Sequence, residues 1–567
     1  MIEQASLIIG DGNWAVKSDS LLGYKLIDGK YYPRQMSATR ATTATRINAQ
    51  GLVELVPYNF VRYSQEISNT GYWAHYLSTL TANTTTAPDG TLTADTISIT
   101  GSSGSAYQFY TYSGGIHTLS CYFKKINEDN VYIDGNSSSG YYGATFNLTT
   151  QAITLFGGGF SPLIESVGNG WYRCSVQADG NGSGSYGFGV YAGAGQSAYI
   201  WGAQLNEGTI KTYLPTTDRL DIPRIDYSTG SSALLAEPQR TNLITYSEDF
   251  SQANWLYLNS SFSANSIVSP SGTTSADTIL ETTANGVHQV YNITTSSSGT
   301  YAASIFIKRK NNRYVAIQLS DFATGELQCI FDFDNSSIST SVSGSWTNAF
   351  FDFEELQNDW FRIKMSGTQN AGSVVAFVTR LLNDSLQSSY VGNVNNGVYI
   401  WGAQLEAGSY ATSYIPTTST SVTRNADVLS YSSLNSLDVT TTTNYTWFLD
   451  LGNDTIVNNF DIRLGGIGLY LIGTGSQGTQ WSLYNFTSLN QILSNTNITG
   501  NRKICLTYNS GVLKVFANNQ LLTTYSGSIT SDVLTFLMSN ADNRLVLNTL
   551  AIFNTTLSDT DALNLIS

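Results

Sequence analysis

Charged residues are scarce in this sequence. They make up 12% of its 567 residues, whereas 12% of the chain is aromatic and 41% is hydrophobic. An ordinary cytosolic enzyme is about a quarter charged, and a disordered chain is poor in aromatic and β-branched residues, so both classes are excluded. The composition predicts a compact β-rich protein with an uncharged polar surface, and the length predicts three or four domains.

Basic residues are outnumbered by acidic residues. The chain has 27 lysines and arginines and 41 acidic residues, which gives a net charge of −14 and a pI near 4.6. A chain with this charge repels a phosphate backbone and an anionic membrane surface. We therefore expect no nucleic-acid partner, whereas a glycan or another protein remains compatible with the charge.

Long hydrophobic runs are absent. No stretch approaches the roughly 18 apolar residues that a membrane-spanning helix needs. The only apolar cluster near the N-terminus is the short run at residues 7–9, and no basic region precedes it. We expect neither membrane insertion nor an export signal.

Cysteine and histidine are also rare. Cys121, Cys174, Cys329 and Cys505 show no C-x-x-C motif and no metal-ligand spacing. The three histidines stand in no H-E-x-x-H or triad pattern, and the chain has no G-x-S-x-G elbow and no phosphate-binding glycine loop. The sequence predicts no disulfide framework, no catalytic residue and no cofactor.

What the sequence does contain is a tandem duplication. YIWGAQL occurs at residues 199–205 and again at residues 399–405, followed by TYLPTT in the first place and SYIPTT in the second. Segments such as SIFIKRK, RYVAIQLSD and WFRIKM alternate apolar and polar residues, and clusters of Gly, Asn and Ser separate them. This alternation is typical of strands that bury one face, so each copy predicts an antiparallel β-sandwich.

The duplication also assigns the cysteines and tryptophans to the interior. Cys121 aligns with Ile305, and Cys174 with Ile363, so both thiols occupy apolar positions. Four tryptophans recur in apolar strand patterns, and we expect their rings to fill the space between the two sheets of each sandwich. They are Trp171, Trp201, Trp360 and Trp401.

After about residue 426 the pattern changes to short, closely spaced strands. Asn518 and Asn519 stand where a two-residue hairpin turn requires positive φ. Near the end, Ser558 can cap a short helix and Asp561 completes a capping-box-like pair. This region predicts a third β-sandwich of about 135 residues with a brief closing helix.

Residues 1–56 match neither pattern. They carry six basic and five acidic side chains, so this segment is near neutral while the rest of the chain is strongly acidic. We expect a docking element, and a plain N-terminal arm is the alternative. The predicted organisation is an anchoring or docking segment at 1–56, a β-sandwich at 57–217, a linker at 218–240, the second copy at 241–418, a linker at 419–433 and the third sandwich at 434–567.

Three stretches resemble segments of structural proteins from tailed bacteriophages. They are SATRATTATRINAQGLVE (37–54), IPRIDYSTGSSALLAEPQRTNLITYSEDF (222–250) and YIWGAQLEAGSYATSYIPTTSTSVTRNADVLSY (399–431). In that group such linkers join carbohydrate-binding-module-like jelly rolls to a concanavalin A-like (laminin-G-like) sandwich. KVFANNQLLTTY and LAIFNTTLSDTDALNLI are similar to the last hairpin and closing strand of the laminin-G-like class.

The resemblance implies an all-β fold class: two tandem antiparallel jelly-roll sandwiches, a concanavalin A-like sandwich and a short N-terminal anchoring segment. It also implies a non-enzymatic protein of the virion surface, made in the host cytoplasm. Head fibres, decoration proteins and tail fibres all use these modules. The implied partners are other virion proteins through residues 1–56, two further copies in a homotrimer, and glycans.

Two alternatives from other classes remain. The chain could be a tail receptor-binding fibre that hydrolyses glycans, or a bacterial adhesin or carbohydrate-binding appendage. Hydrolysis requires two acidic residues, and residues two apart on a strand share one face. The closest such pairs are Asp332 with Asp334, and Asp352 with Glu354.

Asp332 and Asp334 align with an asparagine and a threonine in the first copy. A solvated outer face whose charges blunt edge pairing explains them best, and a Ca²⁺ site is the alternative. We expect no bound metal, with Ca²⁺ as the one candidate cation.

Glycan binding without catalysis requires exposed aromatic rings beside neutral polar groups. In AYQFYTY, Tyr107 and Phe109 share one face of a strand, so if they fill the core, the next two tyrosines are displayed. Tyrosines in two glycine-rich segments are further candidates, because glycine lets a ligand approach the backbone. The candidates for carbohydrate binding are Tyr110, Tyr112, Tyr141, Tyr142, Tyr186 and Tyr191. With 35 tyrosines in the chain, burial is the alternative for each.

Overall fold

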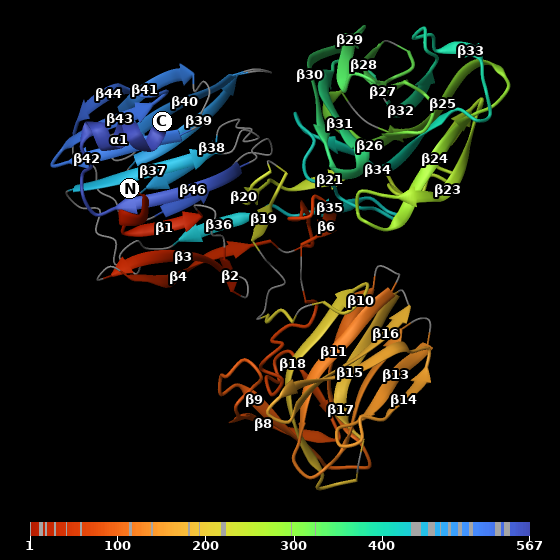
Figure 1. Cartoon of the computed structure of the whole chain (residues 1–567), viewed down its shortest axis with the longest axis vertical. Coiled ribbons are helices and arrows are strands. Elements are labelled where there is room, and N and C mark those ends of the chain that lie inside the picture. Colours follow the sequence, from red (N-terminus) through yellow and green to blue (C-terminus); the bar gives the residue numbers. More distant parts are fainter. Residues whose placement is uncertain are drawn as a thin grey trace. The chain divides into compact units, whose positions relative to one another are not determined.

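The structure is a computed structural model of the whole chain (Figure 1). It describes residues 2–10, 15–17, 20–27, 30–40, 42–56, 59–112, 116–137, 140–179, 182–191, 193–211, 213–216, 223–228, 230–295, 298–323, 325–372, 374–431, 444–451, 460–464, 467–474, 478–485, 490–497, 503–527, 534–537 and 545–567. The chain divides into two compact units, one formed by residues 57–222 and the other by residues 1–56 with 223–567.

The first unit is a sandwich of two antiparallel sheets. One sheet has the strand order β14 (Ile153–Gly157), β13 (Gly140–Asn147), β12 (Asn130–Ser137), β17 (Gly182–Val190), β10 (Gly104–Tyr112) and β7 (Ala74–Tyr76). The other has the order β15 (Phe160–Gly168), β16 (Trp171–Asp179), β11 (Ile116–Lys125), β18 (Ser197–Glu207), β9 (Ala94–Ile99) and β8 (Ser78–Thr85). We call the sheet that contains β12 and β13 the front sheet.

The second unit contains a sandwich with the same strand order. One sheet runs β22 (Leu256–Leu258), β25 (Asn285–Thr295), β32 (Val374–Leu382), β27 (Tyr314–Ser320), β28 (Glu326–Asp332) and β29 (Ser337–Val342), with β33 (Ser389–Val391) beside β25. The other runs β23 (Ser260–Val268), β24 (Thr274–Glu281), β34 (Gly397–Ala407), β26 (Gly299–Arg309), β31 (Trp360–Gln369) and β30 (Trp346–Glu355). The all-β class and the tandem sandwiches are confirmed.

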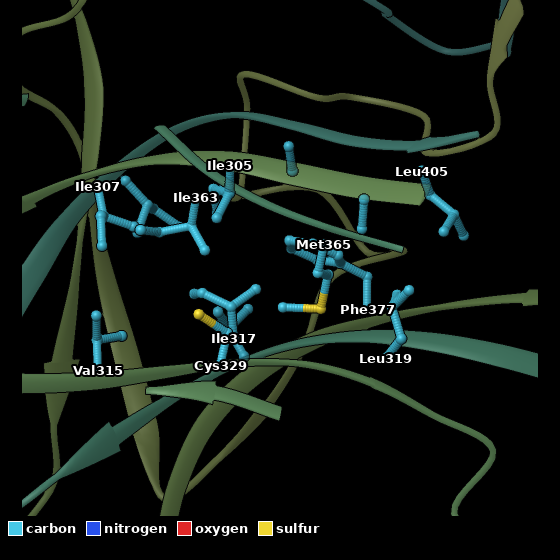
Figure 2. Packing of buried hydrophobic residues seen from close by; sticks show 14 of the residues in the cluster. Ile305, Ile307, Val315, Ile317, Leu319, Cys329, Ile363, Met365, Phe377 and Leu405 are labelled. Atoms are coloured by element: carbon cyan, nitrogen blue, oxygen red, sulfur yellow. The ribbon is translucent and has the colours of Figure 1, made fainter. Parts of the chain in front are cut away.

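The core of the second sandwich lies between its two sheets. Figure 2 shows Ile305, Ile307, Ile363 and Leu405 from one sheet facing Val315, Ile317 and Leu319 from the other, with the Cys329 sulfur among these apolar groups. All four cysteines of the chain are buried and free of disulfides. Burial raises the pKa of the Cys329 and Cys505 thiols to about 12, which keeps them protonated and unreactive. The packing role predicted for the cysteines is confirmed.

The recurring tryptophans are buried, but not between the sheets. Trp360 and Trp401 belong to a separate cluster with Phe306, Tyr414 and Val53, while the inward neighbours of these residues line the main core. Trp171 and Trp201 form the corresponding cluster in the first sandwich. The predicted position between the sheets was wrong. Strand β26 pairs irregularly with β34 beside Trp401, and the chain that follows β34 covers the outer face of this sheet, so the rings are buried there.

The remaining strands of the second unit form one antiparallel network around the C-terminal region. From residues 428–553 they are β36 (Val428–Tyr431), β37 (Asn444–Leu451), β38 (Phe460–Leu464), β39 (Ile467–Thr474), β40 (Gly478–Asn485), β41 (Asn490–Asn497), β42 (Lys503–Asn509), β43 (Val512–Ala517), β44 (Gln520–Ser526), β45 (Leu534–Leu537) and β46 (Leu545–Phe553). The predicted turn at Asn518 and Asn519 is confirmed, since both have positive φ. The closing helix α1 (Asp559–Ile566) is confirmed too, with the Ser558 hydroxyl accepting from the Asp561 amide.

The N-terminal segment belongs to this same network. It contains β1 (Leu7–Gly10), β2 (Ala15–Lys17), β3 (Ser20–Ile27) and β4 (Lys30–Thr39), preceded by the turn η1 (Ile2–Gln4). Strand β1 pairs with β46 along its whole length, and β4 pairs with β36. Figure 1 shows β1, in red, beside β46, in blue. The structure therefore differs from the predicted division, in which residues 1–56 stand apart from the C-terminal sandwich.

Residues predicted as linkers are also structured. In the stretch of sequence that follows the first sandwich, β19 (Arg224–Asp226) pairs with β20 (Ala233–Ala236). Strand β20 pairs in turn with β46. Strand β21 (Arg240–Asn242) pairs with β35 (Val422–Arg424). The hairpin of β5 (Thr45–Ile47) and β6 (Val53–Leu55) packs on the tryptophan cluster of the second sandwich. The pairings of β20 with β46 and of β21 with β35 join strands far apart in the chain, so local sequence could not reveal them.

Five buried charged residues join these segments, and we call them the junction network. Glu237 accepts from Arg224 at 3.0 Å and from Arg424 at 2.6 Å, while Asp427 pairs with Arg224 and accepts from Arg40 at 2.7 Å. None of the five side chains is more than 8% exposed. Burial alone would raise the pKa of Asp427, but the three guanidinium groups hold it below its usual value.

Among the described residues, no helix has the length and apolar character that crossing a membrane requires.

The pairing of β1 with β46 makes a testable prediction about Ile8. Its side chain packs with Phe553, Leu565 and Ile566. Replacing it by alanine removes buried methyl groups and should lower the free energy of unfolding of this region by about 2–5 kcal/mol. Hydrogen–deuterium exchange of Ile8→Ala should be faster in β46 and α1 and unchanged in residues 57–222. Unchanged exchange in β46 and α1 would contradict the shared fold, and the exposed Ile293→Ala serves as control.

The junction network makes a second prediction. Asp427→Asn leaves Arg40 and Arg224 buried beside a neutral group, which should lower the free energy of unfolding by about 3–5 kcal/mol in urea denaturation. Asp334→Asn removes a more exposed partner of Arg309 and should change it by less than about 1 kcal/mol. Equal effects of the two substitutions would contradict the role of the network.

The same carboxylate sets a pH dependence. Because its pKa is lower in the folded chain than in the unfolded chain, Asp427 stabilises the fold above the unfolded pKa of about 4. This stabilisation is lost as the pH falls through the depressed folded-state pKa. Denaturation curves measured below pH 4 should therefore converge for the native protein and Asp427→Asn.

Candidate functional site

The candidate site lies on the outer face of the front sheet of the first sandwich. Val131 and Ile133 of β12 are fully buried, so the alternate residues Tyr132 and Asp134 must point away from the core. Asp134 lies opposite glycines on both neighbouring strands, Gly143 of β13 and Gly187 of β17. Paired residues of antiparallel strands share a face, so the strand register identifies every residue around Asp134.

Seven aromatic side chains share this outer surface, and we call the set the aromatic face. They are Tyr76, Tyr107, Phe109, Tyr132, Tyr141, Phe156 and Tyr191. The exposed fractions are 76% for Phe109, 63% for Tyr191, 55% for Tyr76 and 52% for Tyr141. Isolated exposed aromatic residues are common, so four on one sheet face make this surface a candidate interaction site.

The rings of the aromatic face contact one another in three pairs. Tyr141 stacks on Phe156, with ring centroids 5.3 Å apart and planes inclined by 19°. Tyr132 meets Tyr191 edge to face at 6.3 Å, and Tyr107 meets Phe109 edge to face at 5.6 Å. These contacts hold the rings in place. Tyr132 is buried in its pair, while Phe109, Tyr141 and Tyr191 stay more than half exposed.

Glycines lie beneath these side chains. A Cβ atom at Gly143 would lie 2.5 Å from the ring of Phe156, and one at Gly189 would lie 2.8 Å from the ring of Tyr132. A Cβ atom at Gly187 would lie 2.5 Å from a carboxylate oxygen of Asp134. The missing side chains thus allow the rings and the carboxylate to lie close to the backbone of the sheet.

Asp134 is the only Asp, Glu, Lys or Arg in the six strands of the front sheet. Its Oδ2 accepts a hydrogen bond of 2.8 Å from the Tyr141 hydroxyl. Burial raises the pKa of Asp134, and the bond from Tyr141 opposes that shift. Burial also raises the pKa of Tyr132 to about 12, with the Asp134 charge adding to the effect. Within the part of the chain that the structure describes, Asp134 has no ion-pair partner.

The second sandwich has the same framework but a different outer surface. The strand register places Ala316 where the first copy has Tyr132, Gln318 in place of Asp134, and Gln328 in place of Gly143. Gln318 donates to the Gln328 side-chain oxygen at 2.7 Å. The seven-ring set is therefore not repeated in the second copy, where Tyr291 at the position of Tyr107 meets Phe322 edge to face at 5.5 Å.

Two of the six predicted carbohydrate-binding tyrosines, Tyr141 and Tyr191, lie on the aromatic face. Tyr110 does not: it is half-buried on the opposite side of β10, where its ring packs on Phe60 with centroids 4.3 Å apart. The Tyr112 side chain lies outside the described residues. The condition that Tyr107 and Phe109 fill the core is not met, because the side of β10 that carries Ala106 and Gln108 faces inward.

Tyr142 and Tyr186 are buried, which corrects their prediction as open platforms. Tyr142 is 2% exposed and its hydroxyl lies 2.9 Å from His117 Nε2. Tyr186 is 1% exposed and donates to Gln108. Both tyrosines alternate with the outward-facing residues of their strands, so their side chains point into the core.

The two acidic pairs of the second sandwich are engaged by basic side chains. Arg313 donates to both oxygens of Asp332 at 2.9 and 2.8 Å, and it also pairs with Asp334. The Arg313 hydrogen bonds lower the pKa of Asp332. Lys364 pairs with both Asp352 and Glu354 at 2.7 Å. Positive charges at these carboxylates disfavour a bound cation such as Ca²⁺.

Each histidine has a hydrogen-bond partner within its own sandwich. His75 lies 3.2 Å from the Ile67 carbonyl, and His288 lies between the carbonyls of Asn259 and Tyr390. Over the described residues, no group of three or more His, Cys, Asp or Glu side chains is arranged to hold a metal ion.

Sequence reasoning missed five members of the aromatic face, Tyr76, Tyr107, Phe109, Tyr132 and Phe156, and it missed Asp134. A signal for part of this set was present. VYID in the first copy aligns with VAIQ in the second, and the shared Val and Ile positions identify the inward side. The residues between them, Tyr132 and Asp134, are then outward-facing.

Comparison with protein-family models and with curated proteins finds no match. Among solved structures, the N-terminal CBM22-1–CBM22-2 tandem domain of Paenibacillus barcinonensis Xyn10C is 12% identical, with a TM-score of 0.20 over 62% of this chain and 98% of that chain. A complex of the plant peptide RALF23 with FER and LLG2 is 12% identical, with a TM-score of 0.15 over 58% of this chain and 89% of that chain. At these TM-scores neither likeness carries an argument, so the fold assignment rests on the strand pairing.

Proposed function

We propose that this chain is a non-enzymatic glycan-binding protein whose first sandwich binds sugars on the aromatic face. The observation that carries the proposal is the group of four strongly exposed rings on one sheet surface, set among glycines. Sugar rings present C–H groups that pack on aromatic faces, and their hydroxyls need neutral polar partners. Asn136 and Ser185 of the same outer surface supply such partners.

The second sandwich serves as a scaffold in this proposal. Its equivalent surface carries Gln318 and Gln328 bonded to each other where the first copy has Asp134 and Gly143, and it has the smaller ring pair of Tyr291 and Phe322. When a domain is duplicated, both copies can keep the core while only one surface changes. One copy can then bind a ligand while the other has a structural role. The absence of a free acid pair or a catalytic histidine contact among the described residues favours binding over hydrolysis.

For the biological setting, we propose the surface of a bacteriophage particle. This part rests on the resemblance of residues 37–54, 222–250 and 399–431 to segments of phage structural proteins. Docking to other virion proteins through residues 1–56 and assembly as a homotrimer stay predictions. Such docking would use those parts of the segment that the pairing of β1 with β46 leaves accessible.

The binding proposal predicts the behaviour of the full chain in affinity electrophoresis. Gels containing a soluble polysaccharide, with hydroxyethylcellulose, xylan and host surface polysaccharide tested separately, should retard the protein in at least one case. The double variant Phe109→Ala, Tyr141→Ala should lose that retardation, because it removes ring surface at two separate places. No new reducing ends should form during incubation.

Two controls separate binding from folding. Phe322 of the second sandwich is as exposed as Tyr141. Phe322→Ala should leave the retardation intact. Thermal unfolding of the double variant should stay close to that of the native protein, since both residues are exposed. Retention in none of the gels, or equal retention of the double variant, would contradict the proposal.

The virion setting predicts that an antibody against this chain labels intact phage particles. Gold particles seen by electron microscopy should lie on the outer surface of the head or tail at regular positions. Labelling confined to disrupted particles, or none at all, would remove the setting and leave the binding proposal standing.

A further inference from the structure

The position of Asp134 is unusual for a carboxylate. It occupies the interior of β12, on a sheet whose six strands contain no Lys, Arg or Glu. Its hydrogen-bond donor from another side chain is the Tyr141 hydroxyl, at 2.8 Å. A partly buried carboxylate that lacks a cationic partner loses hydration without gaining an ion pair, so its environment is complete only when a cation approaches.

The rings around Asp134 favour the same kind of ligand. A cation that lies over the face of a tyrosine or phenylalanine within about 6 Å is attracted by the electron-rich ring. Tyr141 and Tyr132 border Asp134 in space, and Tyr107 lies on the same row of the sheet, opposite Gly187. A carboxylate within a set of aromatic rings thus combines two attractions for positive charge at one place.

We propose that Asp134 makes the aromatic face selective for glycans that carry a protonated amino group, such as polymers of a deacetylated hexosamine. An ammonium group supplies both charge and hydrogen-bond donors to the carboxylate, whereas a hydroxyl supplies only a donor. The inference rests on the proposed function, and it adds the chemical class of the sugar. The net charge of −14 on the chain attracts such a ligand over longer distances.

Comparison of the two copies supports the assignment. At the position of Asp134 the second sandwich has Gln318, which is bonded to Gln328. The shared core therefore does not require an acidic residue there. An Asp at this position, beside Tyr132 and Tyr141, has its explanation in what the surface binds.

Three hexasaccharides with one β-1,4-linked backbone test the proposal. Cellohexaose has a hydroxyl at C2, the N-acetylglucosamine hexamer has a neutral amide there, and the glucosamine hexamer has an amino group. Titration calorimetry of the full chain at mildly acidic pH and low salt should show about tenfold tighter binding of the glucosamine hexamer than of the two neutral sugars, as one charge-assisted hydrogen bond supplies. Added salt should reduce this preference.

Two substitutions show where the preference originates. Asp134→Asn keeps an acceptor for Tyr141 and removes the charge, and it should bring the three affinities to within about twofold of one another while cellohexaose binding persists. Glu165→Gln removes one exposed negative charge from β15, on the opposite sheet of the same sandwich, and should leave the preference unchanged. Thermal unfolding of both variants should match that of the native protein.

The outcomes are distinguishable. Equal binding of the three sugars by the native protein, or an undiminished preference in Asp134→Asn, overturns the inference and leaves the proposed function intact. An equal loss in Glu165→Gln also overturns it, because the preference would then come from overall charge. Binding of none of the three sugars overturns the inference, and retention in none of the polysaccharide gels overturns the proposed function.

Discussion

The alternation of side chains across strands packed between two sheets determines the surface of this molecule. In β12, Val131 and Ile133 fill the core, so Tyr132 and Asp134 have only the outer side available. A slip of one residue would bury the carboxylate and expose the aliphatic groups. The buried residues thus fix the register of the front sheet, and the register fixes which rings stand beside Asp134. The chemistry of the aromatic face therefore depends on the packing of the core.

The duplication separates what the fold requires from what the surface does. Both sandwiches share strand order, buried tryptophan clusters and inward aliphatic positions. They differ where the core sets no constraint, with Asp134 on one outer face and Gln318 on the other. Around the second sandwich, the junction network and the pairing of β1 with β46 join segments from both ends of the chain into one unit. In the proposed function, support and ligand contact fall to different parts of one polypeptide.

Local signals predicted much of this fold. The repeat at residues 199–205 and 399–405 revealed the two sandwiches, and the alignment of Cys121 with Ile305 identified a buried thiol. Long-range pairing carries no local signal, so the place of β1 beside β46 was not predictable. The residues of the candidate site were less predictable than the fold. Tyr141 and Tyr142 are neighbours in a glycine-rich segment, and composition alone cannot tell which of them faces outward. Only the strand register separates Tyr141 on the surface from Tyr142 in the core.

The most direct test of the central claim is to map where sugar contacts the full chain. Hydrogen–deuterium exchange with and without the glycan that retards the protein most strongly reports this segment by segment. Ligand bound on the front sheet should slow exchange in β12, β13 and β17 and leave the equivalent β27, β28 and β32 unchanged. Slowed exchange confined to the second sandwich or to the C-terminal strands would contradict the account.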